Sequence, residues 1–255
     1  CALPIWGLPA MYELEKIKVQ SLHHKTHVAE LWHGQTDAWE QMSLSELAEI
    51  FLAVKREVAR LELHAAEMPL NFAMPAVELV WPAAALLAWK GGMPLHLAIC
   101  AGAPEDPCAK FLRTGRLPGG LSDRTREAAG VILEIIGAPE QAALARQGEA
   151  LCLAPEELAR LTQMIGVDAV TDARGENYVR KIYEMTEYVL HPETGRLYTG
   201  LQDYRVMWAE STPSVILALQ DPLKAADQVC ALLGLPDAAA LQAAQAGGRG
   251  RFVEY

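Results

Sequence analysis

The stretch that decides the fold lies at residues 31–40 and reads Leu-Trp-His-Gly-Gln-Thr-Asp-Ala-Trp-Glu. Two short β-rich runs precede this stretch. They are residues 18–22 and residues 27–32, and the second run extends into its first two residues. The polar turn at residues 23–26 predicts that these runs pair as a hairpin. A long helical pattern follows, so the stretch connects a predicted hairpin to the longest predicted helix.

That helix is predicted to begin with a capping box, because Ser43 is followed three residues later by Glu46. Apolar residues then recur at spacings of three and four, which is typical of one buried helix face. They are Leu44, Leu47, Ile50, Phe51, Val54, Val58, Leu61 and Ala65. Lys55 falls on the polar side, and we expect it to be a solvated charge.

A strand–helix–strand pattern occupies residues 70–101. Residues 70–75 form an apolar run that ends at a proline, residues 82–90 are helical in pattern, and residues 96–101 form a second apolar run. This order predicts parallel strands joined by a crossover helix. We therefore expect an α/β protein with a small, mostly parallel sheet flanked by helices.

Residues 103–170 are mostly helical in pattern, with proline or glycine at the expected ends. The predicted helices are residues 107–114, 125–136 and 155–165. Thr171 or Asp172 can cap a fourth helix. Its inward stripe is predicted to be Tyr178, Ile182, Met185 and Val189.

The C-terminal part contains one more predicted strand and one more capped helix. Residues 214–219 are β-rich, and Asp221 followed by Pro222 is typical of a helix N-cap and first residue. Gly234 is expected to end that helix. The alanine-rich residues 237–250 follow.

Composition narrows the functional class. The chain has 255 residues, of which 51% are hydrophobic and 21% charged, enough to bury a core in one or two domains. The net charge is −10, and no basic stripe exists, so we expect no nucleic-acid partner. No apolar run approaches the roughly 20 residues that span a bilayer, so we expect no membrane partner and a cytoplasmic location.

The cysteines do not form a metal-binding or redox motif. None of them occurs in a Cys-x-x-Cys pair, and no second ligand lies at a useful spacing, so no metal is expected. Buried free thiols in a reducing compartment are the favoured interpretation. The five cysteines are Cys1, Cys100, Cys108, Cys152 and Cys230.

The N-terminus is unusual for a natural start. Residues 1–6, Cys-Ala-Leu-Pro-Ile-Trp, lack a methionine, and the first five match the translation of a common sequencing-adapter end. We expect residues 1–16 to be disordered or artefactual. Residues 17–255 are then expected to form a single α/β domain.

Four blocks of this sequence resemble threonine synthases, in the order of that family: residues 31–40, 72–94, 99–115 and 191–224. The first is similar to the family's Leu-Phe-His-Gly-Pro-Thr-x-Ala-Phe-Lys. The second is similar to Val-Pro-Thr-Gly-Asn-Phe-Gly and a following Lys-x-Gly-Leu-Pro. The third resembles Ile-x-Ala-Thr-Asn-x-Asn-Asp with Arg-Phe-Leu-x-x-Gly, and the fourth resembles Pro-His-Thr-Ala and Thr-Ala-His-Pro-Ala-Lys.

The resemblance implies the large domain of a fold-type-II pyridoxal phosphate enzyme. In that family the last residue of the first block is the lysine that holds the cofactor as a Schiff base. Glu40 stands at that position here. A carboxylate forms no imine and repels the anionic cofactor, so the catalytic position is not intact.

The other cofactor positions implied by the resemblance also differ. The glycine-rich phosphate loop corresponds to Val77, Glu78, Leu79 and Val80, whose bulk and charge are unsuited to an anion. The partner of the pyridine nitrogen corresponds to Leu219, which has no hydroxyl. We therefore expect no cofactor, and pyridoxal phosphate only if the protein is an active enzyme.

His33, Gly34 and Thr36 are retained from the first block. They are interpreted either as a remnant of an active-site wall or, more simply, as parts of a tight turn. The interval between Glu40 and Pro75 is mostly filled by the long helix. The family's small, cofactor-covering domain is therefore expected to be missing.

Two functional hypotheses follow. The first is a catalytically inactive threonine synthase-like protein that acts by interaction, either with itself as a homo-oligomer or with a complete paralogue. The second is an active pyridoxal phosphate-dependent lyase that converts O-phosphohomoserine to threonine and phosphate. The first is favoured because several functional positions differ together.

Overall fold

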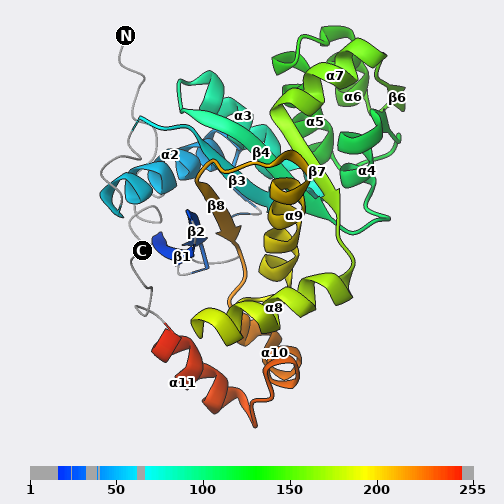
Figure 1. The fold of residues 1–255 in the computed structure, drawn as a ribbon. Helices are drawn as coiled ribbons and strands as arrows, with labels where there is room; N and C mark the ends of the chain where they lie inside the picture. The colour runs from blue at the N-terminus through cyan, green and yellow to red at the C-terminus, as the bar shows by residue number, and fades with distance from the viewer. Residues whose placement is uncertain (1–16, 24, 33–38, 40, 62–66, 249–255) are drawn as a thin grey trace.

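The computed structural model describes residues 17–23, 25–32, 39, 41–61 and 67–248 (Figure 1). They form a six-stranded sheet in the order β1-β2-β8-β3-β4-β7. Only β1 is antiparallel to its neighbour; the other five strands run parallel. The strands are β1 Lys18–His23, β2 Thr26–Glu30, β3 Leu70–Pro75, β4 Leu95–Gly102, β7 Ile165–Ala169 and β8 Ser214–Ala218, and a separate ribbon pairs β5 Arg116–Leu117 with β6 Leu151–Cys152.

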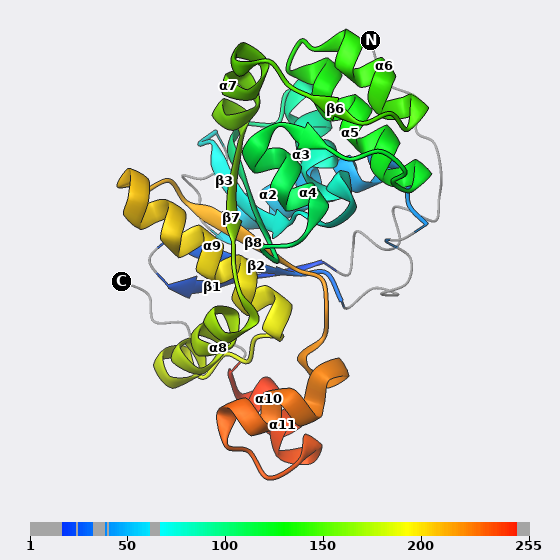
Figure 2. The same ribbon diagram turned by 90° about the vertical axis from the view of Figure 1, so that its right-hand side faces the viewer.

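Helices cover both faces of this sheet (Figure 2). The helices are α2 Leu44–Leu61, α3 Val80–Lys90, α4 Pro107–Thr114, α5 Asp123–Ile135, α6 Pro139–Gln147, α7 Pro155–Met164, α8 Asp172–Thr186, α9 Pro192–Trp208, α10 Ala226–Leu233 and α11 Ala238–Gly248, with 3₁₀ helices η3 Val77–Leu79 and η4 Pro222–Ala225. The predicted fold class, a small and mostly parallel sheet flanked by helices, is confirmed.

The core follows from the alternation of side chains along the strands. On β3, Phe72 and Met74 face the layer of α2, α3 and α5, whereas Ala73 faces α8 and α9. On β8, Val215 faces the layer of α2, α3 and α5, and Ile216 faces α8 and α9. Because both faces of the inner strands are buried, these strands are mostly apolar, as parallel strands usually are. The buried polar exceptions are Asn71 on β3 and Ser214 on β8.

Small residues let α9 approach the sheet and its neighbour closely. A Cβ on Gly195 would lie 2.6 Å from Val179 Cγ2 and 2.7 Å from the Gly175 carbonyl oxygen, both on α8. A Cβ on Gly200 would lie 3.0 Å from that of Ala101 on β4. Larger residues at these positions would push α9 away from α8 and the sheet.

The predicted hairpin and the predicted capping box are both confirmed. β1 pairs with β2, and the Ser43 N–H donates to Glu46 Oε2 at 2.8 Å while the Glu46 N–H donates to Ser43 Oγ at 3.3 Å. The apolar stripe of α2 is buried from Leu47 to Val58. Leu61, however, is 53% exposed, because the stripe passes beyond the edge of the core at the end of the helix. Ala65 lies outside the described residues.

The prediction for Lys55 was wrong. Its side chain is buried, and Nζ donates a hydrogen bond to the Met68 carbonyl oxygen. Burial lowers the pKa of Lys55. The aliphatic stem of a lysine can cover apolar surface while the amine finds a polar partner, and helical position alone does not reveal such a partner.

Three further elements differ from the sequence-based expectations. The edge strand β7 follows α7 directly. A separate helix, α6, begins at Pro139, and α9 is a long helix where the sequence indicated only short motifs. On α8 the inward face comprises Gly175, Val179 and Ile182, whereas Met185 is 64% exposed. The buried face of α8 differs from the predicted stripe because Gly175, rather than a large apolar residue, makes the closest contact with α9.

Two expected properties of the chain can be compared with the described residues. Cys100, Cys108 and Cys230 are buried free thiols, whereas Cys152 is exposed, and no group of metal-binding side chains occurs in the described part of the chain.

Among the described helices, none by itself is long and apolar enough to cross a membrane. Only the bent pair Pro222–Leu233 and Ala238–Gly247 together has the length and composition of a membrane span.

The pairing of Phe51 with Phe72 provides a test of the core. Both rings are fully buried, with centroids 5.1 Å apart in an edge-to-face arrangement. We expect Phe72→Ala to lower the free energy of unfolding by about 3–5 kcal/mol, because it leaves a cavity between α2 and the sheet. The exposed Met185→Ala is the control, with an expected change within about 0.5 kcal/mol. Urea denaturation followed by circular dichroism measures both, and equal effects would contradict the assignment of the core.

Candidate functional site

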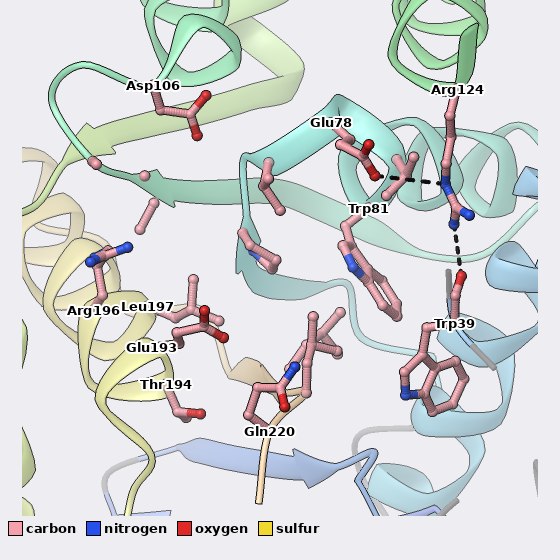
Figure 3. A pocket seen from close by; sticks show the side chains of 18 residues that line it. Trp39, Glu78, Trp81, Asp106, Arg124, Glu193, Thr194, Arg196, Leu197 and Gln220 are labelled. Atoms are coloured by element: carbon pink, nitrogen blue, oxygen red, sulfur yellow. Dashed lines mark hydrogen bonds and ion pairs between the residues drawn. The ribbon is translucent and has the colours of Figure 1, made fainter. Parts of the chain in front are cut away.

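A cavity of about 710 Å³ lies where β3, β4 and β8 end (Figure 3). Pro75, Gly102 and Leu217 mark the strand ends at its wall. Loops at the carboxyl ends of parallel strands are the usual place for ligands in open α/β sheets. All four sequence blocks contribute to this wall, so the fold brings together segments far apart in the chain.

The loop between β3 and α3 has an unusual backbone. Glu78 and Leu79 both adopt left-handed conformations, with φ of 55° and 60°. Such values are unfavourable for residues with a Cβ. The Leu79 N–H donates to the Ala76 carbonyl oxygen at 3.0 Å, and Cys108 is buried close to this loop. Burial, followed by the charge of Asp106, raises the pKa of Cys108 to about 12, so the sulfur there is a neutral thiol.

Carboxylates occupy the helix N-termini around the cavity. Asp106 caps α4 by accepting a hydrogen bond from the Cys108 N–H at 2.8 Å. Glu193 lies in the first turn of α9, and Glu78 lies in the 3₁₀ turn before α3. All three line the cavity. The partial positive charge of these helix ends therefore already faces side chains of the chain itself.

His191 caps α9 from outside the cavity wall. Its Nδ1 accepts a hydrogen bond from the Glu193 N–H at 3.2 Å. Burial lowers the pKa of His191 to about 4, so the imidazole is neutral at physiological pH. A neutral ring with an unprotonated Nδ1 is the form that can accept this bond.

Two arginines line the cavity, and both are engaged. Arg124 donates to the Trp39 carbonyl oxygen at 2.7 Å and lies 4.0 Å from Glu78. Arg196 pairs with Asp172, which is not part of the cavity wall. Neither guanidinium is therefore an unpaired positive charge that could attract an anion.

Two indoles form the aromatic part of the wall. The rings of Trp39 and Trp81 have centroids 6.1 Å apart at an angle of 59°. Trp39 is only 8% exposed, and its Nε1 has no hydrogen-bond partner among the described residues. Figure 3 shows Trp39 and Arg124 on one side of the cavity and Asp106, Glu193 and Arg196 on the other.

The structure brings most of the described candidate residues together. Val77, Glu78, Val80 and Leu219 line the cavity, whereas Leu79 is fully buried in the core. Glu40, His33, Gly34 and Thr36 lie outside the described residues, so their predicted roles stay predictions.

Sequence reasoning missed the remaining charged and aromatic residues of the wall. Asp106 before Pro107 and Glu193 after Pro192 are signals of helix starts, and both residues do lie at the beginning of a helix. Nothing in the sequence pattern singled out Trp81 or Arg124, because their position depends on how α3 and α5 pack.

Comparisons with known proteins give a fold but no sequence family. No protein-family model and no curated protein matches this chain. Among solved structures, threonine synthase from Brucella melitensis with bound pyridoxal phosphate is similar, with a TM-score of 0.58 and 18% identity. The yeast enzyme gives 0.58 and 15%, and the Escherichia coli enzyme gives 0.51 and 22%.

Each of these likenesses covers 75% of this chain. The same alignments span 43%, 43% and 40% of the respective threonine synthases, less than half of each. At these identities the likeness establishes the fold alone. The chain therefore has a threonine synthase-like α/β fold.

The left-handed loop gives a prediction about stability. We expect Glu78→Gly to raise the free energy of unfolding by roughly 0.5–1 kcal/mol, because glycine adopts a positive φ without a steric penalty. The lost contact with Arg124 is partly exposed and contributes little. Ala76→Gly is the control: Ala76 has φ −79°, so glycine there should destabilise. A Glu78→Gly variant that unfolds at lower urea than the parent would contradict the strain argument.

Proposed function

We propose that this chain is a threonine synthase-like protein that carries out no pyridoxal phosphate chemistry and acts by binding. The observation that carries the proposal is that no described lysine lines the cavity. The described lysines are Lys18, Lys25, Lys55, Lys90, Lys110, Lys181 and Lys224, and none of them lines the cavity. The only other lysine in the sequence is Lys16, outside the described residues.

The remaining wall is also unsuited to the cofactor. A phosphate needs free N–H groups, but the Leu79 N–H is already bonded to the Ala76 carbonyl oxygen at 3.0 Å. Three carboxylates stand at the surrounding helix ends, and they would repel an anion. Leu219, at the position implied for the pyridine-nitrogen partner, offers no hydrogen-bonding side chain.

The cofactor test uses the purified chain with one equivalent of pyridoxal phosphate. We expect no imine absorbance band and, after borohydride, no stoichiometric adduct on any lysine by peptide mass spectrometry. Glu40→Lys should not restore threonine formation from O-phosphohomoserine, because the acidic wall is unchanged. An active threonine synthase is the positive control. A borohydride-trapped lysine adduct in the wild-type chain would instead support the active-enzyme hypothesis.

The exposed apolar surface at the end of α9 supports the proposed role in interaction. Val206, Met207 and Trp208 are 84%, 72% and 65% exposed and follow one another in sequence. Exposed apolar residues at the end of a helix can serve as a contact site between proteins. We propose that it contacts a second copy of this chain or a complete paralogue.

Light scattering after size exclusion tests this contact. We expect the wild-type chain to elute above its monomer mass at micromolar concentrations. The double variant Met207→Ala with Trp208→Ala should shift it toward monomer, because the apolar contact is lost. Met185→Ala, equally exposed but on α8, should leave the mass unchanged. A wild-type monomer that also fails to associate with a complete threonine synthase would overturn the interaction proposal.

A further inference from the structure

We propose that Asp168, Arg174 and Asp203 form a proton-dependent latch between the edge strand β7 and α9. The latch is closed while the two carboxyl groups hold a proton between them, and it loosens when that proton leaves. The inference concerns the face of the sheet that α8 and α9 cover. It depends neither on the cavity nor on the contact at the end of α9.

The latch joins three elements of the fold. Asp168 lies on β7, Arg174 on α8 and Asp203 on α9. Arg174 Nη2 donates a hydrogen bond to Asp203 Oδ2, and Arg174 Nη1 lies 3.9 Å from Asp168 Oδ2. One guanidinium group therefore stands beside two carboxyl groups, and one negative charge is left unbalanced when both of them are ionised.

Close packing holds α9 against β7 at this point, and the two elements lie side by side (Figure 2). A Cβ on Gly200 would lie 3.6 Å from that of Asp168, and a Cβ on Gly166 would lie 2.9 Å from Tyr204 Cε2. Gly166 and Asp168 are two residues apart on β7, so both face α9. Repulsion between the carboxylates of Asp168 and Asp203 therefore acts directly across the contact between β7 and α9.

The surroundings of Asp168 favour its protonated form. Its Oδ2 is buried and accepts no hydrogen bond from the described residues. A buried carboxylate oxygen without a donor is unfavourable, and binding a proton removes the charge. Burial, followed by the neighbouring Asp203, raises the pKa of Asp168 to about 6, against the opposing charge of Arg174.

The other elements packed on β7 add no charge beside this pair. Helices α4 and α7 pack on the opposite face of the strand, together with Val167, and β4 presents apolar residues on the face of Asp168. Tyr204 of α9 also faces β7, and burial raises the pKa of its phenol, which is therefore neutral. In the described part of the chain, the charges beside Asp168 are those of Arg174 and Asp203.

The direction of the pH dependence follows from linkage. When the latch opens, Asp168 returns to the ordinary aspartate pKa of about 4, so the closed latch binds the proton more tightly. The stabilisation is fully present below about pH 4 and is lost as the pH rises to about 6. Among the described strands β7 pairs only with β4, so the edge strand is the element free to respond.

Carbon NMR of the full chain, labelled at the aspartate carboxyl carbons, tests the shared proton. We expect the pair Asp168 and Asp203 to titrate close to pH 6, and this titration to be absent in Asp168→Asn. Arg174→Gln should move the titration to higher pH, because the guanidinium opposes protonation. Glu184→Gln, an exposed acid on α8, is the control and should leave it unchanged.

Hydrogen exchange of the β7 amides, corrected for the intrinsic effect of pH, tests the opening. The protection of the wild-type chain relative to Asp168→Asn should fall by about tenfold between about pH 4.5 and about pH 7. Taking the ratio cancels the effects of the other carboxylates. Asp203→Asn should reduce the fall and move the titration below that of the wild-type chain, because the burial of Asp168 remains.

Two results would overturn the inference. The first is that neither Asp168 nor Asp203 titrates between about pH 5 and about pH 7 in the wild-type chain. The second is a protection ratio that does not change with pH, measured against Asp203→Asn if Asp168→Asn does not fold. Both measurements use the chain without pyridoxal phosphate or a binding partner, so they are distinguishable from failure of the proposed function.

Discussion

The burial of both sheet faces is the constraint on which the rest of this structure depends. Inner strands such as β3 and β8 have apolar residues pointing into helix layers on either side, and their buried polar side chains, Asn71 and Ser214, hydrogen-bond each other near the starts of these strands. Polar groups can face a common space only where these strands end. The cavity consequently lies where β3, β4 and β8 end, and Trp39 and Glu193, which do not follow these strands, complete its wall.

The N-termini of α3 and α4 meet at the same edge, because each of these helices begins just after a parallel strand ends. In many proteins such ends bind an anionic ligand. Here Glu78 stands before α3 and Asp106 caps α4, while Glu193 stands in the first turn of α9, which follows α8. The chain therefore places its own carboxylates at these helix ends.

Much of the fold could be predicted from local signals. The hairpin, the capping box at Ser43 and the strands around residues 70–102 depend on short-range patterns, and the structure contains all of them. The failures have a common physical origin in tertiary contacts. Lys55 is buried because the Met68 carbonyl lies within reach, and the face of α8 is set by close packing at Gly175. Residues of the cavity wall were predicted only where they correspond to a position in a threonine synthase motif, as Glu78 and Leu219 do.

The likeness to threonine synthases explains where the cavity lies but not what it binds. At 15–22% identity the shared property is the arrangement of strands and helices, and that arrangement alone places an opening at the strand ends. The position of the cavity is therefore no argument for the same ligand. Ligand chemistry has to be inferred from the side chains that face the opening. On the described wall these are the carboxylates of Glu78, Asp106 and Glu193, the guanidinium groups of Arg124 and Arg196, and the indoles of Trp39 and Trp81, with no lysine among them.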